Sequence, residues 1–179
     1  MSHNLWLKTK NVLLGSSCFP EETNEEQVET ECENGWTKAS IAGVDKCFKN
    51  IGQYHLSRVF SECERFDAKL PMPKSEQENV DLSDFIKNVF GTTHAALGAT
   101  DKEVEGEWRD VDGNLLTYTA WCDCGEPSNG NGIEHYVQYR AWDFPKWNDV
   151  SGRTMNSFIC EKAPIERKSV LLWFETNLI

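Results

Sequence analysis

The stretch Trp121–Asp149 reads WCDCGEPSNGNGIEHYVQYRAWDFPKWND, and its apolar residues follow no helical period. Pro127 fixes the backbone between Glu126 and Ser128, and a cis bond there would turn both flanking side chains the same way. Gly130 and Gly132 permit the tight return of a loop that wraps around an ion. Oxygen-bearing side chains recur along the stretch at Glu126, Ser128, Glu134, Asn148 and Asp149.

These five side chains are candidate calcium ligands. Calcium takes about six to eight oxygen ligands at irregular geometry, and loops supply such ligands readily. The stretch has no EF-hand spacing, however, and on composition alone an ordinary polar loop is the alternative interpretation.

The charge and the cysteines of the whole chain limit its partners and its compartment. The formal net charge is −11, so phosphate backbones repel the chain and nucleic acid is not an expected partner. Widely spaced cysteines indicate disulfides in an oxidising compartment, and an odd number leaves at least one thiol free or paired with another chain. The cysteines are Cys18, Cys32, Cys47, Cys63, Cys122, Cys124 and Cys160.

An extracellular, secreted location follows from these cysteines, although no complete secretion signal is visible. Lys8 and Lys10 interrupt the apolar residues of 5–14, so no full hydrophobic region forms there. No stretch approaches the roughly 20 apolar residues of a membrane span, and none is expected.

The chain divides into three parts. Residues 1–31 carry repelling glutamates and are predicted to be an acidic tail or linker, and 32–163 form the compact domain. Residues 164–179 form an apolar C-terminal tail that is too short to span a bilayer and could pack on the domain or mediate association.

Two helices are predicted, followed by short strands and long loops, which makes the fold class α+β. The first covers 57–68, with Ser57 as its cap and an apolar face of Val59, Phe60, Cys63 and Phe66. A capping box at 75–78 opens the second helix, and Gly91 ends it. Its apolar face is expected to contain Val80, Phe85, Ile86 and Val89.

Residues 32–163 resemble the long form of the C-type lectin-like domain. The order and spacing of its short motifs carry the resemblance: Gly35-Trp36, Cys47-Phe48, Leu97–Asp101, Gly106–Asp110, Glu126–Ser128, Trp147–Asp149 and Phe158–Lys162. The resemblance implies two helices packed on short antiparallel sheets with a long calcium-binding loop. It also implies the disulfides Cys63–Cys160 and Cys32–Cys47. Trp108 and Trp147 are expected to lie in the core, with a platform for a sugar as the alternative.

The same resemblance assigns the main calcium ion to Glu126, Ser128, Glu134, Asn148 and Asp149. In such lectins this ion coordinates two vicinal hydroxyls of a sugar, which its ligands also hydrogen-bond. Glu-Pro loops usually favour mannose, glucose, N-acetylglucosamine or fucose. The usual third residue is Asn, so the Glu-Pro-Ser sequence here is a variant of the mannose-type loop, for which weaker or altered binding is expected.

Two further departures concern the long loop. Tyr136 and Gly152 occupy positions where the family places a stapling disulfide, and Cys122 and Cys124 could compensate by pairing with each other, with Cys18 or with a second chain.

An auxiliary calcium site would use Asp101 and Glu105, but Asn129 and His135 replace acids there, and a plain loop is the alternative. Arg140, Trp142 and Lys146, which precede Trp147, could extend contact with a sugar.

The predicted function is therefore calcium-dependent carbohydrate binding in recognition, adhesion or innate defence, with glycans or glycoproteins as partners. A homo-oligomer would raise the avidity of such weak sites. The alternative is a lectin-like domain that binds a protein or another non-sugar ligand, with calcium structural or absent. An enzyme is not expected, because nothing positions a nucleophile or a base with an orienting partner.

Overall fold

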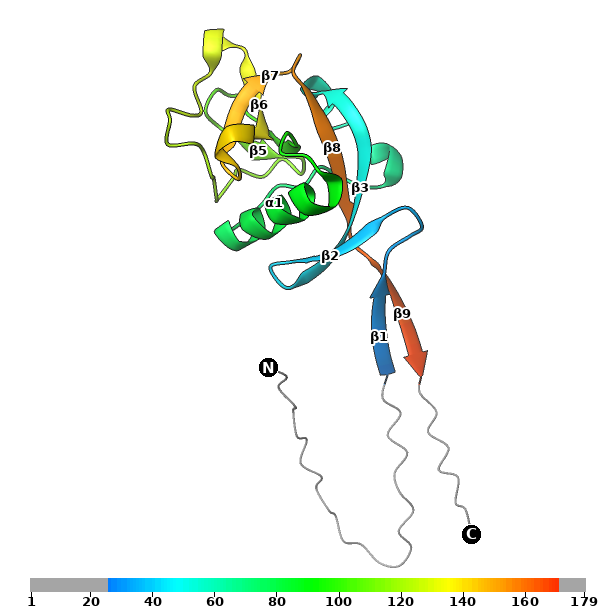
Figure 1. Ribbon diagram of the computed structural model, residues 1–179. Coiled ribbons are helices and arrows are strands. Elements are labelled where there is room, and N and C mark those ends of the chain that lie inside the picture. The colour runs from blue at the N-terminus through cyan, green and yellow to red at the C-terminus, as the bar shows by residue number, and fades with distance from the viewer. Residues whose placement is uncertain (1–25, 171–179) are drawn as a thin grey trace, which may run out of the picture. The chain divides into compact units, whose positions relative to one another are not determined.

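The computed structural model of the protein describes residues 26–170 (Figure 1). Its main body is Val28–Arg167, and the following paragraphs concern that unit. Strands β1 (Glu26–Glu31) and β9 (Ile165–Val170) pair with each other. β1 lies at the end of the predicted N-terminal tail, and β9 lies in the predicted C-terminal tail. The remainder of both tails, including Cys18, lies outside the described residues.

Two antiparallel sheets form the body, which confirms the predicted α+β class with short sheets. One has the order β2-β3-β8, from Thr37–Ile41, Val44–His55 and Met155–Lys162. The other has the order β5-β4-β6-β7, from Arg109–Asp110, Ala96–Thr100, Glu134–Tyr139 and Trp147–Ser151. The second sheet carries the residues of the candidate site on β6 and β7.

Helix α1 (Glu76–Phe90) begins and ends where the sequence predicts. Ser75 caps it by accepting a hydrogen bond from the Glu78 amide (3.2 Å), and Gly91 ends it in the left-handed conformation. The predicted apolar face is partly wrong, because Val80 and Val89 are 39% and 49% exposed. The buried positions are Asn79, Leu82, Ser83 and Ile86.

The prediction of an α-helix over 57–68 is wrong. The segment contains two short 3-10 helices, Leu56–Arg58 and Glu64–Phe66, and ends in a left-handed Asp67. The amides of Leu56 and Ser57 donate to the carbonyls of Thr154 and Gly152, which holds the start of the segment to a distant loop. Ser, Val, Phe and Cys are weak helix formers, so these tertiary contacts prevail over the apolar period.

Helix α1 is joined to the second sheet by a buried polar side chain. Asn79 accepts a hydrogen bond from Trp147 Nε1 (2.8 Å) and donates one to the Pro145 carbonyl (3.1 Å). Trp147 is completely buried and Trp108 is 7% exposed, so both lie in the core as expected. This contact fixes the start of β7, which supplies two candidate calcium ligands.

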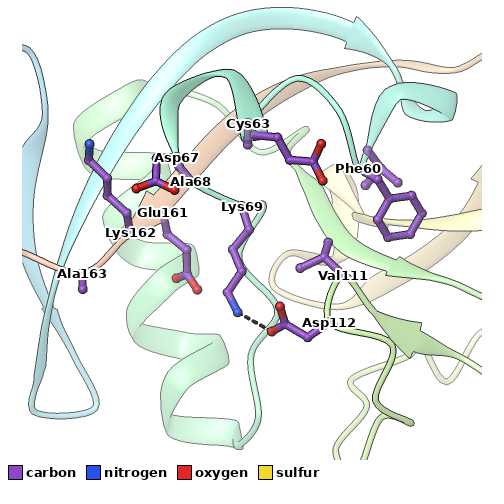
Figure 2. Close-up of a pocket in the computed structure, with 12 residues that line it drawn as sticks. Phe60, Cys63, Asp67, Ala68, Lys69, Val111, Asp112, Glu161, Lys162 and Ala163 are labelled. Carbon is purple, nitrogen blue, oxygen red and sulfur yellow. Dashed lines mark hydrogen bonds and ion pairs between the residues drawn. The ribbon is translucent and has the colours of Figure 1, made fainter.

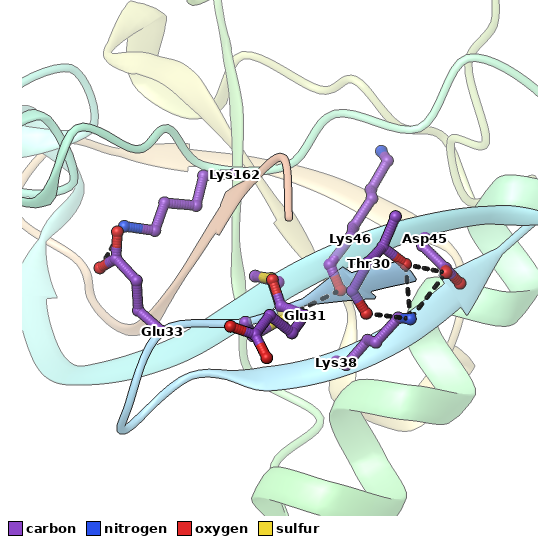
Figure 3. The surroundings of a disulfide bond; sticks show 9 residues. Thr30, Glu31, Glu33, Lys38, Asp45, Lys46 and Lys162 are labelled. Carbon is purple, nitrogen blue, oxygen red and sulfur yellow. Dashed lines mark hydrogen bonds and ion pairs between the residues drawn. A yellow bond between two sulfur atoms is a disulfide. The ribbon is translucent and has the colours of Figure 1, made fainter. Parts of the chain in front are cut away.

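Three disulfides occur among the described residues. They include Cys63–Cys160 and Cys32–Cys47, the two pairs that the resemblance implies. Near Cys32–Cys47, Lys38 donates hydrogen bonds to the carbonyl and hydroxyl oxygens of Thr30 (Figure 3). Cys122 pairs with Cys124, which was one of the three alternatives for that loop.

Candidate functional site

The long loop and two strands of the second sheet supply the five predicted ligands. Glu126 and Ser128 flank Pro127, whose peptide bond is cis. Glu134 is the first residue of β6, and Asn148 and Asp149 lie on β7. Asp149 is paired in register with Val137, so the sheet places β7 beside β6 directly below the loop.

Asp149 holds the loop backbone. Its carboxylate is 1% exposed and accepts hydrogen bonds from the amides of Ser128 (2.9 Å) and Asn129 (2.7 Å). Backbone donors to a carboxylate are charge-assisted and comparatively strong. The loop residues after Pro127 are therefore fixed to the sheet.

Glu134 binds the part of the loop from Ser128 to Gly130. Its Oε2 accepts hydrogen bonds from the Gly130 amide (2.6 Å) and from the Ser128 hydroxyl (3.3 Å). A Cβ on residue 130 would lie 2.6 Å from the same oxygen, so any larger residue there would have to displace the Glu134 carboxylate. Ser128 thus contacts both Glu134 and Asp149.

Glu126 faces an internal cation. Arg140 Nη1 lies 2.8 Å from Glu126 Oε1, and the two side chains are only 15% and 11% exposed. The second oxygen, Glu126 Oε2, is buried and has no hydrogen-bond partner. Burial, followed by the neighbouring Asp149 carboxylate, raises the pKa of Glu126.

The structure therefore brings four of the five predicted ligands together. Asn148 adjoins them on β7, but its amide donates to the Asp149 carbonyl (2.8 Å). The sequence analysis placed Arg140 as a possible sugar contact and missed its pairing with Glu126. A basic residue among the acidic side chains of this stretch was the available signal for the pairing. Trp142 is 77% exposed, and the Arg140 guanidinium lies over its ring, 4.7 Å from the ring centroid, in a cation–π contact.

The two positions of the absent stapling disulfide are in contact without it. Tyr136 is 6% exposed, and a Cβ on residue 152 would lie 2.7 Å from its ring. The ring therefore packs directly on Gly152 and closes the base of the loop where the family uses a covalent bond.

Three residues of the predicted auxiliary site also come together. His135 Nδ1 lies 3.1 Å from Asp101 Oδ1 and 3.6 Å from Glu105 Oε2. Asn129, which the sequence places in the same site, uses its side-chain oxygen to accept a hydrogen bond from the Glu134 amide (3.3 Å).

A cavity of about 380 Å³ lies elsewhere, and none of the five predicted ligands lines it. Lys69 pairs with Asp112 across it, Phe60 lies at one side, and the Glu161 carboxylate reaches toward it (Figure 2).

Within the described part of the chain, the helices are all too short or too polar to cross a membrane.

Comparisons with known proteins agree with this fold. In structure the chain is similar to the carbohydrate-recognition domain of the mouse scavenger receptor C-type lectin, with 26% identity over 74% of this chain and 96% of that chain and a TM-score of 0.62. It also shares the fold of the C-type lectin CEL-I from Cucumaria echinata (22% identity, 73% and 96% coverage, TM-score 0.64). A calcium-independent type II antifreeze protein has the same fold (23% identity, 76% and 98% coverage, TM-score 0.61).

The comparison with protein families is the decisive one. The family model described as "Lectin C-type domain" matches residues 52–162, which is more than half of the chain. The protein therefore belongs to the C-type lectin domain family.

Proposed function

We propose that Glu126, Ser128, Glu134, Asn148 and Asp149 bind calcium and, with it, the vicinal hydroxyls of a mannose-type sugar. C-type lectin domains are not enzymes, so the function is recognition. The disulfides are consistent with an extracellular setting, where glycans or glycoproteins would be the partners in adhesion or innate defence.

The single observation that carries this proposal is the buried, unpartnered Oε2 of Glu126. A buried carboxylate oxygen without a donor is costly, and a cation beside it removes that cost. The adjacent Asp149 carboxylate, whose proximity contributes to the raised pKa of Glu126, would offer a second oxygen donor to the cation. The donor set, made of oxygens on a loop, is the type that calcium takes.

Calcium, when bound, would be a cation able to coordinate the oxygen atoms of the sugar hydroxyls. The chain's own residues would orient the sugar. The Ser128 hydroxyl and the Asn148 amide can donate, and the carboxylates of Glu126 and Glu134 can accept from hydroxyl groups. Ser128 is shorter than the usual Asn and has no amide donor, so we expect weaker binding than a Glu-Pro-Asn loop gives.

Two of the similar structures bear on the two halves of the proposal. The mouse protein is a carbohydrate-recognition domain, which favours a sugar ligand. The antifreeze protein is calcium-independent, so the fold alone does not require calcium.

A second candidate function is binding of a non-sugar ligand without calcium. The observation that favours it is the Arg140–Glu126 ion pair, because a guanidinium already neutralises one of the calcium ligands. Arg140 would then be a permanent part of the site.

Retention on immobilised mannose, with calcium or with a chelator, separates the two candidates. We expect retention in calcium, loss with chelator, and loss in Glu126→Gln, which removes the charge but keeps the shape. The matched control is Glu107→Gln, an exposed carboxylate paired with Arg109, which should bind as the unmodified protein does. If mannose and a broader glycan array show no calcium-dependent binding, the sugar proposal fails and the second candidate stands.

A further inference from the structure

Asp101, Glu105 and His135 form a cluster of metal-ligating side chains beside the calcium loop. One ligand atom from each residue lies within 4.8 Å of the other two. The imidazole Nδ1 faces both carboxylates, at 3.1 Å from Asp101 and 3.6 Å from Glu105. Such a convergence of one nitrogen and two oxygens is the geometry of a small chelating site.

Two of the three side chains are fixed by the second sheet. Asp101 directly follows β4 and its side chain is 1% exposed, with Oδ2 accepting a hydrogen bond from the Gly106 amide (2.9 Å). His135 lies on β6, and its carbonyl accepts a hydrogen bond from Thr100 Oγ1 (2.6 Å). This leaves Asp101 Oδ1 and His135 Nδ1 pointing at each other from neighbouring strands. Such prior ordering reduces the entropy lost when a ligand binds.

The donor set does not fit the auxiliary calcium ion that the resemblance suggests. Calcium prefers oxygen ligands, about six to eight of them, and here an imidazole stands where an acid is expected. Asn129 offers only a neutral amide oxygen in place of an acid, and that oxygen accepts a hydrogen bond from the Glu134 amide. Imidazole and carboxylate together suit zinc and neighbouring transition metals, at lower coordination numbers.

We propose that Asp101, Glu105 and His135 bind a transition-metal cation of the zinc type in place of calcium. His135 coordinates through Nδ1, each carboxylate supplies one oxygen, and water completes the coordination. Glu105, which is 57% exposed, closes the site from the solvent side. This site does not depend on the sugar-binding proposal, since it shares no ligand with it.

Titration of the full chain with zinc chloride tests the proposal. Calorimetry measures the binding, and thermal unfolding measures the effect on stability. We expect zinc to raise the melting temperature and His135→Ala to weaken zinc binding at least tenfold. Cobalt(II) serves as a spectroscopic probe, because a low-coordinate site with a nitrogen ligand gives visible absorption that His135→Ala should abolish. Asp101→Asn provides a second variant in which the buried side chain keeps its shape.

The matched controls are His94→Ala, which removes an exposed histidine from the same protein, and Glu126→Gln in the calcium loop. Both should leave zinc binding unchanged. Absence of zinc binding, zinc binding that persists in His135→Ala, or calcium binding at this cluster would each overturn the proposal. In the first case, His135 acts only as an internal hydrogen-bond partner of Asp101.

Discussion

Arg140 brings a permanent positive charge to the residue on which the calcium proposal depends. Its guanidinium cannot be deprotonated in a protein, and its partner Glu126 is mostly withdrawn from water. Because both groups are largely buried, neither is well solvated if the other is removed. In the proposed site, calcium would therefore share Glu126 with Arg140 or displace the guanidinium.

Replacement of Arg140 by methionine, which retains an unbranched apolar stem, separates these roles. We expect the calcium-free protein to lose about 1–3 kcal/mol of stability, because Glu126 loses its charged partner. Calcium affinity should rise roughly tenfold, which corresponds to about 1.4 kcal/mol. Thermal unfolding and calorimetry, each with calcium and with chelator, measure both effects.

Arg153→Met is the control, since Arg153 is exposed and its side chain makes no ion pair among the described residues. A fall in calcium affinity in Arg140→Met would mean that Arg140 supports the calcium ligands and does not compete with the ion.

At the scale of the elements, one amide side chain of helix α1 adds hydrogen bonds to the apolar packing between the helix and the second sheet. Asn79 links the helix to Trp147 and Pro145, and its carbonyl also accepts from the buried Tyr139 hydroxyl (3.4 Å). A satisfied polar contact in a core fixes one arrangement of the elements that share it. Asn79 therefore determines how the helix meets the start of β7.

We expect Asn79→Ala to destabilise the protein by about 1–3 kcal/mol, because it leaves the indole N–H of Trp147 buried without an acceptor. Chemical unfolding measures the loss. Asn88→Ala, at an exposed position of the same helix, should be neutral or slightly stabilising, since alanine is the better helix former. Equal losses in the two variants would show that the effect comes from the helix alone and that the indole bond contributes nothing.

The contrast between the two predicted helices shows what a sequence pattern can decide. The ends of α1 were predictable because Ser75 and Gly91 act on their own neighbours. The segment 57–68 was not, because distant carbonyls of Gly152 and Thr154 hold its first amides. The buried face of α1 includes Asn79, which an apolar pattern cannot select, since its partner Trp147 is 68 residues away.

At the scale of the whole molecule, two disulfides tie distant parts of the chain. Cys63–Cys160 spans 97 residues and Cys32–Cys47 spans 15. In the chain-entropy description, closing about 100 residues stabilises by about 4.7 kcal/mol and closing about 15 residues by about 3 kcal/mol.

We therefore expect the paired replacement Cys63→Ala and Cys160→Ala to lower the melting temperature more than Cys32→Ala and Cys47→Ala. Thermal unfolding of the two double variants under identical conditions makes the comparison. The reverse order would contradict loop closure as the main source of the stabilisation.

The sequence could predict which oxygen-bearing side chains the candidate site contains. It could not predict which residues those side chains contact in the structure. Short oxygen-bearing motifs located Glu126, Glu134 and Asp149 because the family resemblance fixes their spacing. The pairing of Arg140 with Glu126 depends on how the loop folds over β6 and β7, which no local pattern records. The packing of Tyr136 on Gly152 likewise brings together a residue of β6 and one of the turn after β7.

That contact between Tyr136 and Gly152 also affects how the chain reaches its native disulfides. The six cysteines that are paired in the structure allow about 15 fully bonded isomers, and two more at these positions would raise the number to about 105. Reshuffling among such isomers takes seconds to hours. By closing the ligand loop with a ring on a glycine, the chain does without two further cysteines, and the six that pair in the structure have roughly sevenfold fewer possible pairings than eight would have.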